Sequence, residues 1–170
     1  MNKIENLIQK EKWVEARRAI LKDLKKDPKN HWLLTRLSLA YYEQRKYLMA
    51  LETSKKALKI SPTCPLVLWD YAGSLEMTNK EGKAIEIWKK LVRTTPSEGC
   101  WENKSWTLSL KNDCFYRLAK NYKYIGKPKK ALFYLKKYRK HRQQGIKSIY
   151  GSADIKRVMN KNRTTSVVPR

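Results

Sequence analysis

The sequence is poor in the residues that form tight turns and metal sites. Its 170 residues include six glycines and six prolines, too few for an all-β sandwich, which needs a turn signal every ~8 to ~12 residues. The three cysteines, Cys64, Cys100 and Cys114, form no C-x-x-C pair and are accompanied by only two histidines, so no zinc-ligand spacing arises. The sequence therefore predicts a helical protein with no metal and no other cofactor.

Long apolar runs and catalytic motifs are also missing. No run of ~18 apolar residues occurs and the first residues lack the apolar core of a signal peptide, so we expect a cytoplasmic protein without a membrane span. The sequence contains no glycine-rich phosphate loop, no G-x-S-x-G and no H-E-x-x-H, and carboxylate pairs are scarce. We therefore expect a protein that is not an enzyme.

Acidic residues are few and unevenly placed. The chain has 39 Lys and Arg against 15 Asp and Glu, for a net charge of +24. Residues 112–170 hold 17 basic and 2 acidic side chains, whereas residues 65–111 hold 7 and 6. A field of this strength favours anionic partners, and it is concentrated in the C-terminal third.

Prolines and alanines recur at an interval of 34 residues, which is the strongest pattern in the sequence. The members of the two series are Pro28, Pro62 and Pro96, and Ala16, Ala50 and Ala84. Adding 47 to Ala84 reaches Ala131, which indicates a fourth copy displaced by 13 residues. Within each copy the apolar residues are three or four apart, so each copy predicts a helix, a short turn and a second helix.

This pattern resembles the tetratricopeptide repeat family, in which a W-x-x-L-G-x-x-Y motif precedes A-x-x-x-F and a proline. The matching residues of the third copy are Leu68, Tyr71, Ala72, Leu75, Ala84, Trp88 and Pro96. The resemblance implies an all-α, right-handed α-solenoid over residues 1–143. Its expected parts are units at about 1–30, 31–64, 65–98 and 112–145, an insert at about 97–111, a capping helix at 144–159 and a flexible basic tail at 160–170.

The resemblance also implies a function, because tetratricopeptide arrays bind a peptide on the concave face lined by the first helix of each pair. In the register of this sequence that groove is formed by Thr35, Leu39, Tyr42, Trp69, Gly73, Glu76, Tyr116, Lys120 and Lys123. We expect a partner segment with apolar anchors followed by acidic residues, bound by an adaptor, scaffold or chaperone-like protein. Packing between repeats is an equally good explanation for the aromatic members.

The last paired helix supplies the alternative function. If Ala131, Leu135 and Tyr138 face inward, six cations face the solvent: Lys129, Lys130, Lys136, Lys137, Arg139 and Lys140. They predict either a solvated surface or an anion-binding surface of a nucleic-acid-associated protein. Docking to an anionic membrane is a third and weaker interpretation. In the insert, Trp101 and Trp106 either cover the joint between repeats or contribute to function.

Overall fold

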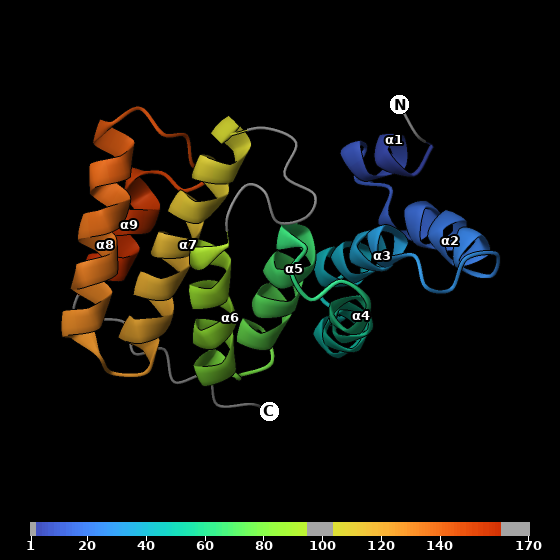
Figure 1. Cartoon of the computed structure of the whole chain (residues 1–170), viewed down its shortest axis with the longest axis horizontal. Helices are drawn as coiled ribbons and strands as arrows, with labels where there is room; N and C mark the ends of the chain where they lie inside the picture. The colour runs from blue at the N-terminus through green and yellow to red at the C-terminus, as the bar shows by residue number, and fades with distance from the viewer. Residues whose placement is uncertain (1–2, 95–103, 161–170) are drawn as a thin grey trace. The chain divides into compact units, whose positions relative to one another are not determined.

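The computed structural model describes residues 3–94 and 104–160, and within these ranges all regular secondary structure is α-helix. The helices are α1 (Lys3–Gln9), α2 (Trp13–Leu24), α3 (His31–Glu43), α4 (Tyr47–Ile60), α5 (Pro65–Glu76), α6 (Glu81–Arg93), α7 (Lys104–Tyr124), α8 (Pro128–Gln143) and α9 (Ser152–Met159). Figure 1 shows these helices along the chain. They divide into two compact units, with α1 to α6 in an N-terminal unit (residues 1–101) and α7 to α9 in a C-terminal unit (residues 102–170). The predicted all-α class is confirmed.

The turns inside the helix pairs repeat with the interval found in the sequence. One residue of each turn has a positive φ, and these residues are Glu11, Arg45, Asn79 and Gly126. The following residue donates its backbone N–H to a carbonyl five positions earlier, as in Lys46 to Tyr41 at 2.9 Å and Lys127 to Tyr122 at 2.8 Å. This is the hydrogen-bond pattern of a helix that ends at a left-handed residue. The same turn therefore occurs four times, 34, 34 and 47 residues apart.

Small side chains allow the two helices of each pair in the N-terminal unit to approach closely. Ala16, Ala50 and Ala84 are fully buried, and a larger side chain there would force the helices apart. Ser38 on α3 uses the short distance to donate its hydroxyl to the carbonyl of Ala50 on α4 at 3.0 Å. The repeated alanine of the sequence is thus a contact between paired helices.

Helix starts are defined by local signals in the sequence. The side chain of Asn30 accepts a hydrogen bond from the backbone N–H of Leu33 and caps α3, which satisfies one of the free donors at a helix N-terminus. Pro65 and Pro128 occupy the first turns of α5 and α8, where the missing N–H costs nothing. Pro28 and Pro62 lie in the turns after α2 and α4, and Pro96 lies outside the described residues.

In the C-terminal unit, α7 and α8 form a helix pair held by aromatic side chains. The rings of Tyr122 and Tyr134 stack with centroids 5.5 Å apart, and Phe115 packs edge-on against His141 at 5.1 Å. Residues 104–111 of the expected insert belong to α7, which is 21 residues long. Trp106 is half-buried on that helix, and Trp101 lies outside the described residues.

Candidate functional site

The first helices of the second and third pairs, α3 and α5, carry the predicted groove residues of the N-terminal unit. Leu39, Tyr42 and Trp69 are half-buried, so part of each side chain reaches the surface. Gly73 lies beneath Tyr42, since a Cβ added at Gly73 would be 3.9 Å from the Tyr42 ring. The Trp69 ring packs edge-on against Trp88 of α6, with centroids 4.9 Å apart. Tyr42 on α3 and Gly73 on α5 thus lie next to each other where these two helices are in contact.

Three of the predicted groove residues on α3 and α5 are buried and serve the packing instead. Thr35 is 1% exposed and donates its hydroxyl to the carbonyl of Trp32 at 2.6 Å, within its own helix. Glu76 is 8% exposed and accepts a hydrogen bond from the indole N–H of Trp88 at 2.7 Å. Gly73 is buried as well. The expectation that Thr35, Gly73 and Glu76 present surface to a ligand differs from the structure, because the neighbouring helices cover them.

Two charged residues next to these positions were missed in the sequence analysis. Arg36 on α3 forms an ion pair with Glu5 of α1 at 2.7 Å and lies over the Trp32 ring, with its guanidinium carbon 5.5 Å from the centroid. Asp70 on α5 is half-buried, and desolvation raises the pKa of its carboxyl to about 7 although the charge of Arg36 opposes the shift. Both residues follow a predicted groove residue directly in sequence. A shifted pKa on a surface with aromatic side chains is typical of a binding site.

The face of α7 that carries Tyr116 and Lys123 is covered by residues 146–160, which we call the C-terminal segment. The rings of Tyr116 and Tyr150 stack with centroids 3.9 Å apart. The ammonium of Lys123 donates to the carbonyl of Arg157 at 3.1 Å and also to that of Asn160. Of the three groove residues predicted here, only Lys120 is exposed. The expected basic end of the groove therefore faces the chain's own C-terminal segment.

A buried carboxylate anchors the same segment. Oδ1 of Asp113 on α7 accepts hydrogen bonds from the Ser148 hydroxyl and from the backbone N–H of Ile149, the latter at 3.3 Å. Burial raises the pKa of Asp113 to about 6, although both hydrogen bonds and the charges of Arg117 and Arg142 lower it. On α8, the buried Tyr138 donates its hydroxyl to the carbonyl of Tyr150 at 2.6 Å. Two helices thus hold the segment through polar contacts that no periodic pattern predicts.

The outer face of α8 carries the predicted anion-binding candidates. Ala131, Leu135 and Tyr138 are buried against α7. All six predicted cations are exposed: Lys129, Lys130, Lys136, Lys137, Arg139 and Lys140. The helix contains no acidic residue. The structure therefore gathers on one helix the positive charge that the sequence places in its C-terminal third.

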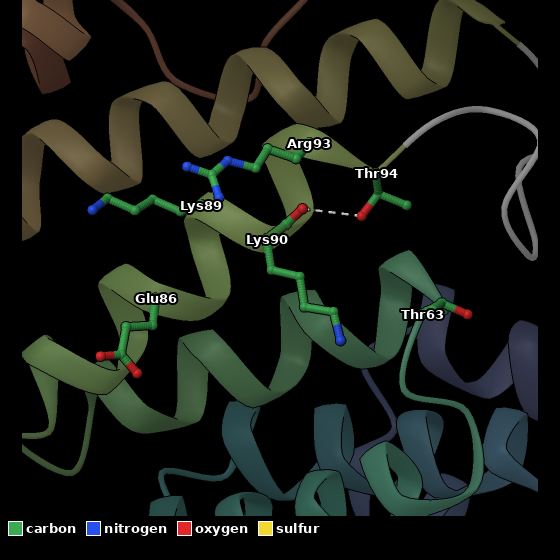
Figure 2. A pocket seen from close by; sticks show the side chains of 6 residues that line it. All are labelled: Thr63, Glu86, Lys89, Lys90, Arg93 and Thr94. Carbon is green, nitrogen blue, oxygen red and sulfur yellow. Dashed lines mark hydrogen bonds between the residues drawn. The ribbon is translucent and has the colours of Figure 1, made fainter.

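A separate basic hollow lies on the N-terminal unit. It has a volume of about 510 Å³ and is lined by Thr63, Glu86, Lys89, Lys90, Arg93 and Thr94. Figure 2 shows that Lys89 and Arg93 extend to one side of α6, whereas Lys90 extends towards α5. Lys90 donates its ammonium to the carbonyl of Pro62 at 2.8 Å, and Thr94 donates to the carbonyl of Lys90 at 3.1 Å. The hollow combines three cations with the Glu86 carboxylate, so it is less basic than the face of α8.

Two further searches cover only the residues that the structure describes. Within residues 3–94 and 104–160, no three His, Cys, Asp or Glu side chains gather as metal ligands would. Among the helices in these ranges, none has the length and apolar character that crossing a membrane requires.

Comparison with known proteins identifies the fold but no family. No protein-family model matches the chain, and no curated protein matches it either. Among solved structures, MamA MSR-1 is 18% identical and superimposes with a TM-score of 0.63 over 82% of this chain and 72% of that chain. MamA AMB-1 is 19% identical, with a TM-score of 0.63 over 81% and 74% of the two chains. Since MamA is a tetratricopeptide-type helical repeat protein, the predicted helical-repeat fold is confirmed: the chain has a fold similar to that of MamA.

Proposed function

We propose that the chain is a non-catalytic protein-interaction module whose α3–α5 face binds a segment of a partner protein. The observation that carries the proposal is the cluster of partly exposed apolar and charged side chains on these two helices. Leu39, Tyr42 and Trp69 provide the apolar part, and Arg36 and Asp70 provide a cation and a carboxyl whose pKa is raised to about 7. Partly desolvated aromatic and arginine side chains are the residues that contribute most of the affinity at protein interfaces.

The side chains on this face indicate which chemical groups the partner segment carries. Lys123, expected at the basic end of the groove, donates to the C-terminal segment instead, so acidic residues are no longer part of the proposal. Asp70 instead favours a partner group that donates a hydrogen bond, because a carboxyl with a pKa of about 7 gains stability from a donor or a cation. We propose an extended or helical segment with apolar anchors beside one donor group.

Site-specific photocrosslinking tests the proposal. A photoreactive amino acid at Leu39 should capture one or a few polypeptides, and nuclease treatment should not release them. The matched control is the same amino acid at Glu52, an exposed position on α4 of the same unit. Equal capture from both positions would contradict the proposal.

The captured segment, made as a peptide, then allows an affinity measurement by calorimetry. Trp69→Ala should weaken binding by about 2 kcal/mol, as expected for an interface residue of large contribution. Because Trp69 also packs on Trp88, Leu39→Asp serves as a second variant, and the circular dichroism spectrum must match the wild type for both. An unchanged affinity in the folded Leu39→Asp variant would exclude this face as the site.

A further inference from the structure

The exposed face of α8 is not purely basic, because it also carries two large apolar side chains. Leu132 is 47% exposed and Phe133 is 53% exposed, side by side in sequence at the middle of the helix. Contact of such side chains with water is unfavourable, and covering them lowers the free energy of the system. The Phe133 ring packs edge-on against Tyr134, with centroids 5.1 Å apart, but about half of each side chain stays exposed, whereas Ala131, Leu135 and Tyr138 are the buried side chains of this helix.

Lysines surround this apolar pair on the same face. Each of Lys129, Lys136, Lys137 and Lys140 is three, four, seven or eight residues from Leu132 or Phe133, so they share one broad face, here called the stripe, with these two residues. The stripe is ~16 Å long at the rise of an α-helix. The ammonium of Lys137 lies 4.8 Å from the centroid of the Phe133 ring, so the positive charge is directly beside the apolar surface.

A small basic cavity adjoins the stripe. It has a volume of about 330 Å³ and is lined by Phe115, Lys137, Lys140, His141 and Gln144. Burial lowers the pKa of His141, and the charges of Lys137 and Lys140 lower it further. Within the described residues, no group forms a hydrogen bond with the buried Nδ1 of His141. The cavity thus offers two ammonium groups and an imidazole to an anion of the size of a phosphate headgroup.

We propose that this face of α8 docks onto the surface of an anionic lipid bilayer. Leu132 and Phe133 enter the boundary between headgroups and acyl chains, the lysines contact the lipid phosphates, and one headgroup occupies the cavity between Lys137, Lys140 and His141. An exposed helix face with an apolar centre and a lysine border matches a flat, negatively charged layer that is apolar beneath its surface. Nucleic acid would match the lysines, but it leaves two adjacent apolar side chains without a role. The proposal is independent of the binding face on α3 and α5.

Vesicle co-sedimentation with the full chain is the test. Phosphatidylcholine vesicles that contain phosphatidylglycerol should bind the protein, and vesicles of phosphatidylcholine alone should not. The double variant Leu132→Ser/Phe133→Ser should lower the partition coefficient about tenfold, since it removes most of the apolar area that the bilayer covers. Each Lys→Gln change at Lys129, Lys136 or Lys140 should lower it about fivefold.

The chain offers matched controls for both kinds of variant. Leu48 and Met49 are an equally exposed apolar pair on α4, at 71% and 48%, and Lys55, Lys56 and Lys59 are exposed lysines of the same helix. Leu48→Ser/Met49→Ser and the corresponding Lys→Gln changes should leave vesicle binding unchanged. Phe133→Trp should retain binding, which separates an apolar requirement from a loss of folding; circular dichroism checks the fold of every variant.

Three results would overturn the proposal. The first is failure of the wild-type chain to bind the anionic vesicles at moderate salt. The second is equal binding by the Leu132→Ser/Phe133→Ser variant, which would mean that the lysines alone bind any polyanion. In that case duplex DNA, added as a competitor, would displace the vesicles from the protein. The third is complete release by inorganic phosphate but not by chloride at the same ionic strength, which would assign the cavity to free phosphate.

Discussion

The two units use the first helix of a pair in different ways. In the N-terminal unit, α3 and α5 leave Leu39, Tyr42 and Trp69 partly exposed. In the C-terminal unit, the corresponding face of α7 is covered by the C-terminal segment, which stacks Tyr150 on Tyr116. The same type of helix pair therefore leaves its first-helix face partly exposed in the N-terminal unit, whereas in the C-terminal unit the chain's own C-terminal segment covers that face.

The units also differ in charge. Residues 1–101 contain 20 basic and 12 acidic side chains, whereas residues 102–170 contain 19 and 3. A smaller positive excess with aromatic side chains suits recognition of a protein segment, and a large excess of one sign suits a polyanion or an anionic surface. This difference in charge fits the two proposed binding surfaces, one on each unit. The contrast between the units can be tested by substitutions in the core of each unit.

The largest expected effect is at equivalent core positions of the two units. Leu91 and Tyr138 each lie seven residues after the repeated alanine and are fully buried. Replacing either by alanine should lower the free energy of unfolding by about 3–5 kcal/mol, because a large cavity results. Only Tyr138→Ala should also accelerate amide hydrogen exchange in residues 146–160, since Tyr138 donates to the Tyr150 carbonyl.

Hydrogen-exchange mass spectrometry and urea denaturation together check this prediction. Tyr138→Phe provides the control, because it keeps the ring and removes only the donor, at a cost of about 1–2 kcal/mol. If Leu91→Ala released the C-terminal segment as strongly as Tyr138→Ala does, the contrast between the units would be wrong.

A smaller effect concerns pH. Folding raises the pKa of Asp70 from 3.8 to about 7 and that of Asp113 from 3.8 to about 6. Between pH 3.8 and these raised values, the two carboxyls bind more protons in the folded chain than in the unfolded chain. The contribution of these two carboxyls to stability should therefore fall as the pH rises from 3.8 and become constant above about 7, whereas the lowered pKa of His141 acts in the opposite sense. At neutral pH Asp70→Asn should stabilise the chain, by an amount on the order of 2 kcal/mol.

The two carboxyls can be distinguished by the pH range in which each variant acts. Asp113→Asn should remove only the part of the pH dependence that ends near 6, and its amide oxygen can still accept from Ser148 and Ile149. Asp70→Asn should remove the part that extends to about 7. Unfolding free energies measured from about pH 4 to about pH 8 would contradict the prediction if the stabilisation by Asp70→Asn did not increase with pH, or if Glu52→Gln at an exposed site had the same effect.

The period of 34 residues was sufficient to predict the fold. The turns that the structure shows at Glu11, Arg45, Asn79 and Gly126 follow the same spacing as the repeated alanines, because local hydrogen bonds and small residues repeat with the chain. The covered face of α7 could not be predicted, because Asp113 and Ser148 meet across 35 residues outside any period. Burial of Thr35 and Gly73 was missed for a related reason: the register indicates the side of a helix but not how far its neighbour covers it.

The same limitation explains why the apolar pair on α8 was missed. Ala131, Leu135 and Tyr138 are buried as their helical spacing predicts, and the opposite side of the helix is marked in the sequence mainly by its charged residues. Leu132 and Phe133 lie between those lysines. Apolar residues in a helix are usually assigned to the core, so their exposure had to come from the packed structure.

The smallest effect compares the turns of the two units. Gly126 has a φ of 70°, and no atom lies within 4 Å of a Cβ built there, so Gly126→Ala should cost about 1 kcal/mol through backbone strain alone. At Arg45, where φ is 57°, the change to Gly should relieve the same strain and stabilise the N-terminal unit by up to about 1 kcal/mol. Gly82→Ala in α6 is the control, because Gly82 has equal space and helical backbone; alanine should stabilise the chain there. Urea denaturation of the three variants gives the signs, and a stabilising Gly126→Ala would show that the turn of the C-terminal unit does not need its left-handed residue.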